Sequence, residues 1–295
     1  MARERPWPRT RAVLALAALV AAAAPLRGHD LWLVPSSFAP EPGAKVSVRI
    51  LVGDGPGEGR PLAPRPGWIE RFVVAGPGGE APVAAVPERD PAGYAGLGER
   101  GVYALGLESG DTLHTLSAER FARFLAEEGL EAAAAGRAGG GSGAGGGSSA
   151  PSGFVRELFS RSVKSLLRVP GAPEGSGRPP APAGGAGSAL GLELELVPLS
   201  DPFDRGAPEL ALRVLLRGVP AAGVLVEAVR LSGGAPASRA VSDREGAVRL
   251  RLSGAEAAGD EGAGGWLVTA VALEPAPPGA DADWRSLWSS LTFER

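Results

Sequence analysis

Short runs in which apolar and polar residues alternate, each bounded by proline or glycine, restrict the fold of this chain more than any other feature. In residues 45–52, every second position from Val46 to Val52 carries a branched apolar residue, and Pro42 and Gly43 lie just before the run. A period of two places such residues on one face of a β-strand. Similar strand-like runs cover residues 31–34, 68–74, 102–107, 192–197, 210–216, 224–231, 248–252, 266–273 and 290–294. Because turn residues separate these runs, the pattern predicts a mainly β fold built from antiparallel sandwiches.

The first 28 residues have the pattern of an export signal. Residues 1–11 contain four arginines, and residues 12–26 are apolar and carry no charge. A helix of this apolar length spans about 22 Å, which is shorter than the roughly 30 Å hydrocarbon core of a bilayer. A cleavable signal peptide is therefore favoured over a transmembrane anchor. Cleavage after Ala23, Ala24 or Gly28 fits the preference for small residues, and we expect a periplasmic or extracellular protein without a membrane span.

Helical patterns occupy residues 117–169, between two β-rich regions. Ser117 is a good N-cap, and Phe121 and Phe124 share one face of the helix that it would begin. A second helix is predicted over residues 153–168, because their apolar residues form a stripe at helical spacing. The basic residues off this stripe are then expected on a solvated face: Arg156, Arg161, Lys164 and Arg168.

Two segments rich in glycine and proline divide the chain further. Residues 136–152 are predicted to be a flexible loop and residues 170–189 a linker. We therefore expect an N-terminal β-sandwich domain over 29–116, a two-helix insert over 117–169, and a C-terminal β-sandwich domain over 190–295. The turn patterns of the last region look like those of immunoglobulin-like and prealbumin-like modules.

Composition excludes several classes of chemistry. The chain has no cysteine, which excludes disulfides, thiolate zinc sites, iron–sulfur ligation and a cysteine nucleophile. The formal net charge is −3, and removing residues 1–28, with five arginines and one glutamate, makes the chain more acidic. Nucleic-acid binding is not expected, because phosphate contacts need clustered Lys and Arg. Motifs of serine and zinc hydrolases do not occur, so we expect a protein that is not an enzyme. A carboxylate pair for glycoside cleavage depends on the fold, and an extracellular hydrolase stays a weaker alternative.

The two histidines are candidate metal ligands. Cleavage after Gly28 would make His29 the N-terminus, where its free amine and imidazole can chelate Ni²⁺, Co²⁺ or Cu²⁺. His114 is the other imidazole, and Asp30 can add an oxygen ligand. Further oxygens are available from Asp111, Asp281 and Asp283. The alternative is that His29 only begins an edge strand and His114 lies in a turn before the helix, with no metal bound.

Tryptophans provide a second candidate site. After residue 28 the chain carries Trp32, Trp68, Trp266, Trp284 and Trp288. Exposed together on one sheet face, these side chains can stack on sugars or on a protein partner. Large aromatics in a sandwich are more often part of the core, and we expect them there.

Residues 29–35, His-Asp-Leu-Trp-Leu-Val-Pro, resemble the opening of an uncharacterised family of exported bacterial proteins. Members are described as the periplasmic component of nickel or cobalt uptake. Residues 121–130, 156–167, 190–199 and 281–294 match the same family in the same order. Family members often carry a histidine in the strand after the late tryptophan, whereas residues 267–273 contain none. The resemblance implies a periplasmic location, binding of Ni²⁺ or Co²⁺ and a membrane metal transporter as the partner.

Together these observations predict an exported protein that is not an enzyme and binds a divalent metal, nickel or cobalt, in support of metal uptake. The expected ligands are His29, His114 and Asp30. The alternative is a metal-free β-sandwich module that binds carbohydrate or a protein partner.

Overall fold

The computed structural model describes residues 30–138, 152–171, 189–252 and 264–295 of the 295-residue chain. The predicted signal peptide, residues 1–28, lies outside these ranges, and so does His29. Nearly all of the predicted loop 136–152 and the predicted linker 170–189 also lie outside them. The expectations for those segments stay predictions.

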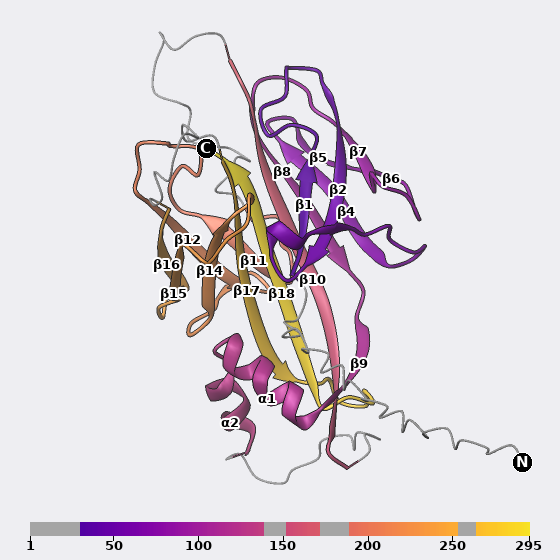
Figure 1. Ribbon diagram of the computed structural model, residues 1–295. Coiled ribbons are helices and arrows are strands. Elements are labelled where there is room, and N and C mark those ends of the chain that lie inside the picture. Colours follow the sequence, from indigo (N-terminus) through magenta and orange to yellow (C-terminus); the bar gives the residue numbers. More distant parts are fainter. Residues whose placement is uncertain (1–29, 139–151, 172–188, 253–263) are drawn as a thin grey trace, which may run out of the picture.

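Three β-sheets make up most of the described structure, which confirms the mainly β class (Figure 1). The long sheet has nine strands, in the order β15 (Ser238–Val241), β14 (Leu225–Arg230), β17 (Gly265–Pro275), β18 (Trp284–Glu294), β10 (Phe154–Val169), β8 (Gly101–Ser109), β4 (Ile69–Gly76) and β5 (Gly79–Pro82), with β9 (Thr112–Ser117) also beside β10.

Two smaller sheets accompany the long one. The first, here called the N-terminal sheet, has β1 (Asp30–Pro35), β2 (Lys45–Gly53), β7 (Gly93–Gly96) and β6 (Ala84–Ala85) in that order, with β3 (Arg60–Pro61) also beside β2. The second, here called the C-terminal sheet, has β11 (Leu194–Pro198), β12 (Glu209–Leu216) and β13 (Val219–Pro220), with β16 (Ala247–Arg251) also beside β12. Short helical segments are η1 (Pro56–Glu58), α1 (Ala118–Glu127) and α2 (Glu131–Ala138).

The two small sheets cover opposite faces of the long sheet. Leu291 of β18 packs into a core cluster with residues of the C-terminal sheet. Its neighbours Ser290 and Thr292 point to the other face, as alternation in a strand requires. There Ser290 Oγ donates a hydrogen bond to the carbonyl oxygen of Leu31 (2.7 Å), and Thr292 Oγ1 donates to that of Leu33 (2.8 Å). These hydroxyl groups satisfy carbonyls of β1, which is the edge strand of the N-terminal sheet.

Strand β10 joins the two halves of the chain. It pairs antiparallel with β8 and parallel with β18, so the long sheet contains strands from both predicted sandwich domains. The two sandwich cores therefore share one sheet. The division into separate domains at the predicted boundaries stays a prediction.

The predicted helix over residues 153–168 is wrong, because this segment is β10. Leu166 belongs to the core under the C-terminal sheet and Leu167 to the core under the N-terminal sheet. A strand that is buried on both faces loses the period-two pattern, and its apolar residues then imitate a helical stripe. Arg161 and Lys164 are buried, which also contradicts the solvated face expected for them, whereas Arg168 is exposed as expected.

The first predicted helix is confirmed as α1. The second helix of the structure, α2, spans residues 131–138, where no helix was predicted and where its end overlaps the start of the predicted loop 136–152. Ser117 caps α1, since its Oγ accepts a hydrogen bond from the Arg120 backbone N–H at 3.2 Å. Phe121 and Phe124 are the buried residues of α1, and both pack against the long sheet near Trp288. The helices thus cover a part of the long sheet on the same face as the N-terminal sheet.

Candidate functional site

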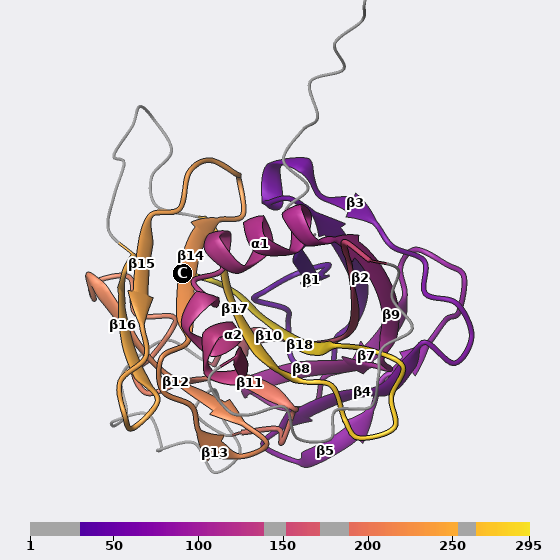
Figure 2. The ribbon, with the colours of Figure 1, turned by 90° about the horizontal axis from the view of Figure 1, so that it is seen from below.

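A pocket of about 610 Å³ lies where the N-terminal sheet and α1 leave the long sheet uncovered. Seen from below, α1, β1, β2 and β9 all lie on the same side of β10 and β18 (Figure 2). The lining is mainly apolar and includes four large aromatic side chains: Trp68, Phe124, Phe159 and Trp288. Its charged side chains are Arg65, Arg120, Arg161 and Glu157. An aromatic pocket of this size with a few polar groups is typical of a binding site for a small organic molecule.

The floor of the pocket comes from two paired strands of the long sheet. Glu157, Phe159 and Arg161 are alternate residues of β10, so all three side chains face the pocket. Trp288 of β18 lies opposite Arg161 in the parallel register. The two sides of the floor are thus fixed by backbone pairing rather than by a loop.

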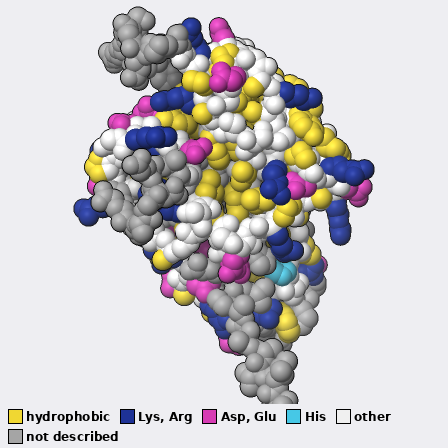
Figure 3. Space-filling view, turned by 45° about the horizontal axis from the view of Figure 1, so that its top comes forward, with side chains coloured by type: hydrophobic (Ala, Val, Ile, Leu, Met, Phe, Trp, Pro, Cys, Tyr) yellow, Lys and Arg dark blue, Asp and Glu magenta, His cyan; other side chains and the backbone are white. Residues whose placement is uncertain are grey.

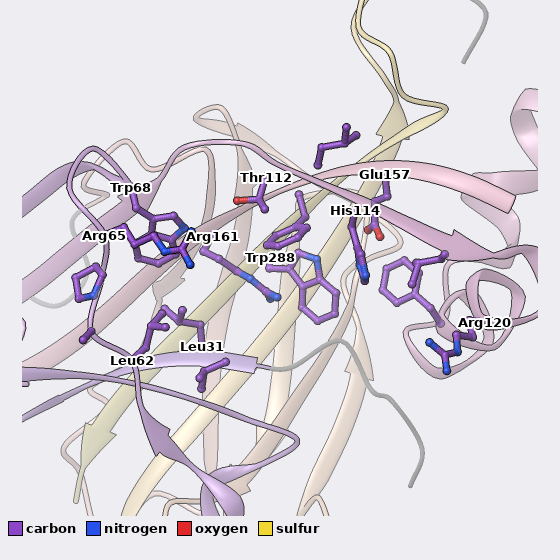
Figure 4. A pocket seen from close by; sticks show the side chains of 17 residues that line it. Leu31, Leu62, Arg65, Trp68, Thr112, His114, Arg120, Glu157, Arg161 and Trp288 are labelled. Atoms are coloured by element: carbon purple, nitrogen blue, oxygen red, sulfur yellow. The ribbon is translucent and has the colours of Figure 1, made fainter. Parts of the chain in front are cut away.

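Arg161 is a buried cation held by aromatic rings. Its side chain points into the pocket beside Trp288 (Figure 4), and the guanidinium carbon lies 4.2 Å from the Trp288 ring centroid and 5.1 Å from that of Phe159. Burial lowers the pKa of Arg161 to about 10, and the carboxylates of Asp30 and Glu157 limit the decrease. The side chain therefore stays protonated at neutral pH.

A hydrogen-bonded chain fixes Trp288 next to Arg161. Trp288 Nε1 donates to Ser286 Oγ at 2.9 Å, and Ser286 Oγ donates to Glu157 Oε1. Glu157 is buried, and this burial raises the pKa of its carboxyl above the ordinary value, although Ser286 and Arg161 oppose the increase. The indole is also stacked on Phe124 of α1, at 5.5 Å between ring centroids. These contacts fix the position of Trp288 in the floor of the pocket.

His114 lies in the pocket wall, in β9 and not in a turn as one interpretation of the sequence had it. It lies opposite Glu157 in the antiparallel pairing of β9 with β10, and its ring meets Phe159 edge to face at 6.4 Å. Partial burial, together with the charge of Arg120, lowers the pKa of His114. The imidazole is therefore neutral at physiological pH and available as a hydrogen-bonding group or ligand.

Asp30 begins β1 beside the same region. It lines a small adjoining space to which Leu31, Arg161 and Trp288 also contribute, and those three residues line the main pocket too. Asp30 and His114 are thus both at the pocket, whereas His29 is outside the described residues.

The other aspartates proposed as oxygen ligands are engaged elsewhere. Asp111 accepts hydrogen bonds from Arg285, at 2.8 Å for the shortest. Asp281 forms an ion pair with Arg156 at 2.6 Å, and Asp283 accepts the backbone N–H of Arg156 at 2.8 Å. Within the described ranges, no group of three or more His, Cys, Asp or Glu side chains is arranged to hold a metal ion. The described residues therefore do not form a metal site by themselves.

A second, polar cavity of about 290 Å³ lies on the other face of the long sheet. Arg285 occupies it and is paired there with Asp111 and Glu193. Because Asp111 and Glu193, two of its acidic side chains, already pair with Arg285, this cavity is less suited than the aromatic pocket to bind a ligand.

The tryptophans are mainly core residues, as expected. Trp32 and Trp266 are 0% and 1% exposed, and Trp288 is 6% exposed. Trp68 and Trp284 are partly buried. The face in Figure 3 shows acidic and basic side chains interspersed around apolar ones, with no patch of a single sign of charge.

The sequence interpretation missed Arg161 and Glu157 as site residues because it placed them on a helix. A signal against that helix was present, since serine is a poor residue for a helix interior and Ser160, Ser162 and Ser165 all fall within it. A strand assignment would have placed Glu157 and Arg161 on one face.

Comparison with known proteins places the chain in a family without assigning an activity. No helix in the described part of the chain has the length and apolar character needed to cross a bilayer. A search of curated proteins gave no match. The family model described as a domain of unknown function, DUF4198, matches residues 26–271. Because this match covers most of the sequence, the chain belongs to the DUF4198 family.

Proposed function

We propose that this chain is a binding protein without enzymatic activity, and that its pocket beside α1 holds a small organic ligand. The observation that carries the proposal is the aromatic pocket of about 610 Å³, with Arg161 buried in its floor. Pockets of roughly 300–1,000 Å³ with apolar walls and a few polar groups accommodate drug-sized molecules.

The proposal keeps the metal-free binding module but replaces its expected partner, a carbohydrate or a protein, with a small organic ligand. Trp32 and Trp266 are fully buried, so they offer no platform for a carbohydrate or protein partner. Trp68 and Trp288 instead lie on the pocket lining, on different elements. This arrangement favours a ligand enclosed between elements over a partner stacked on an open sheet face.

The test uses a fluorescent probe for apolar sites, 1-anilinonaphthalene-8-sulfonate, with the purified protein. We expect saturable binding that Ala63→Trp weakens strongly, because Ala63 is an exposed residue of the pocket lining and the new indole would occupy the entrance. The matched control is Ala81→Trp, an exposed position in β5 that is not part of the lining. Equal affinity of Ala63→Trp and Ala81→Trp for the probe would rule out this pocket as the binding site.

Binding of nickel or cobalt in support of metal uptake is the second candidate function. It is favoured by the location of His114 and Asp30, which lie in or beside the pocket where β1 begins. The described side chains alone do not suffice, so this candidate requires His29 as the mature N-terminus, and its partner would be a membrane metal transporter.

Intact-mass measurement of the exported protein establishes whether cleavage leaves His29 first. Titration calorimetry with Ni²⁺ then compares processed protein with His29→Ala and with a form that carries one extra residue before His29. We expect tight binding only in the unmodified protein, because both changes remove part of the amine–imidazole chelate. Equal Ni²⁺ affinity in all three forms would exclude this site.

A further inference from the structure

We propose that the ligand of the pocket is an amphipathic monoanion, a carboxylate or sulfonate on an apolar body, and that its anionic group binds the guanidinium of Arg161. This inference rests on the proposed function, since it specifies the ligand of the same pocket. It assigns Arg161 the role of the residue that recognises charge.

Arg161 is oriented to present hydrogen-bond donors to the pocket. The guanidinium carbon lies over the Trp288 ring, 4.2 Å from its centroid. A guanidinium packs on an aromatic ring through its flat face, which leaves the N–H bonds in its plane for other acceptors. Figure 4 shows the side chain directed into the pocket, between the sides formed by Trp68 and Trp288. A carboxylate or sulfonate can therefore accept two N–H bonds in its plane.

The charge on Arg161 lacks a close counter-ion in the described structure. Among the described side chains, no carboxylate forms an ion pair with it within 4.0 Å, and the carboxylates of Asp30, Glu157 and Glu128 act on it only at longer range. A buried cation is costly unless it is paired. An anionic ligand would supply the missing pair, and Arg65 and Arg120 at the lining would add favourable potential.

The rest of the lining selects an apolar body. The floor and walls present Phe159, Trp288, Phe124 and Trp68, with Leu62 at the side of the N-terminal sheet. Such a surface stabilises aromatic rings or an alkyl chain by burying apolar area. Of the three arginines in the lining, Arg161 is buried, whereas Arg65 and Arg120 are exposed to solvent. A single buried guanidinium favours a monoanion over a dianion such as a phosphate monoester.

The experiment compares two probes that share their ring system. One is the anionic 1-anilinonaphthalene-8-sulfonate, and the other is the uncharged N-phenyl-1-naphthylamine. In Arg161→Met we expect the dissociation constant of the anionic probe to rise roughly 10- to 100-fold, as for loss of a charged hydrogen bond, and that of the neutral probe to stay within about threefold. In the wild-type protein, dodecanoate should displace the anionic probe at lower concentration than 1-dodecanol.

Arg168→Met is the matched control. Arg168 lies on the same strand, points to the opposite face, and stacks on Phe203 with its guanidinium carbon 4.5 Å from the ring centroid. This change should leave the dissociation constants of both probes unaltered. If Arg161→Met does not fold, Arg161→Lys keeps the charge and loses the planar fork, and it should weaken the anionic probe alone.

The outcomes separate this inference from the proposed function. If both probes bind and Arg161→Met or Arg161→Lys changes neither affinity, the anion inference is refuted and the pocket remains a binding site for neutral molecules. If neither probe binds saturably, or if Ala63→Trp leaves both affinities unchanged, the proposed function fails as well.

Discussion

The buried ion pair of Lys164 and Glu195 predicts that its two members are not equally replaceable. The carboxylate of Glu195 accepts three backbone N–H groups from residues 190–192, at 2.7, 2.9 and 3.2 Å, as well as the Lys164 ammonium. Lys164 Nζ also donates to the carbonyl oxygen of Leu196 at 3.2 Å. Glu195 therefore fixes the conformation of residues 190–192, just before β11, whereas Lys164 mainly neutralises the charge of Glu195.

Lys164→Met should cost about 3 kcal/mol of the free energy of unfolding. Removing one partner of a buried ion pair costs about 3–5 kcal/mol, and the three retained N–H bonds to Glu195 place the loss at the low end. Glu195→Leu should cost more than about 5 kcal/mol, because each buried N–H left without an acceptor adds about 1–3 kcal/mol. Burial lowers the pKa of Lys164, so its amine can become neutral by releasing a proton. The three backbone N–H groups cannot do so and would stay buried without an acceptor.

Denaturation in guanidinium chloride, followed by circular dichroism and extrapolated to water, measures these losses. Glu195→Gln keeps an acceptor oxygen and should lie between the two variants, which maintains the comparison if Glu195→Leu does not fold. The double variant Lys164→Met/Glu195→Leu should be no less stable than Glu195→Leu alone, because the Glu195 carboxylate that accepts the three N–H groups is absent from both proteins. A loss in Lys164→Met equal to or greater than that in Glu195→Gln would refute the reasoning.

Three further predictions concern the long sheet and the pocket. Deleting residues 281–295 removes β18 from between β17 and β10 and should abolish soluble expression; a soluble, folded product would contradict this. Burial raises the folded-state pKa of Glu157, so the contribution of this carboxyl to stability is lost as pH rises through that pKa. Glu157→Gln should remove this pH dependence from the free energy of unfolding, measured from about pH 4 to 8. Wild-type and variant stabilities that change in parallel with pH would be evidence against it. Gly76→Ala should lower the free energy of unfolding by about 1–3 kcal/mol, because the new Cβ would lie 2.2 Å from the Tyr103 ring. In Gly96→Ala the new Cβ would meet no neighbouring atom within 4 Å, and stability should change by less than about 0.5 kcal/mol. Equal melting temperatures of the two variants would contradict this difference.

Local patterns were sufficient for much of the fold. The alternation in 45–52 corresponds to β2, Lys45–Gly53, and that in 248–252 to β16, Ala247–Arg251. Each of these strands buries one face, so apolar and polar residues alternate along it with a period of two. The cap at Ser117 predicted the start of α1 because a capping hydrogen bond forms between residues close in sequence. The strand-like run over 290–294 likewise corresponds to the end of β18, Trp284–Glu294, which is mostly buried.

The sequence by itself determined the β class, α1 and the apolar residues that fill the cores. Only the tertiary structure decided that residues 154–169 form a central strand, since burial of both faces by two different sheets erased the periodic signal. The pocket has the same origin: Arg161 and Trp288 are 127 residues apart in sequence and meet through the parallel pairing of β10 with β18. Such long-range pairing depends on which edges and faces the rest of the chain leaves available, and no local pattern records it.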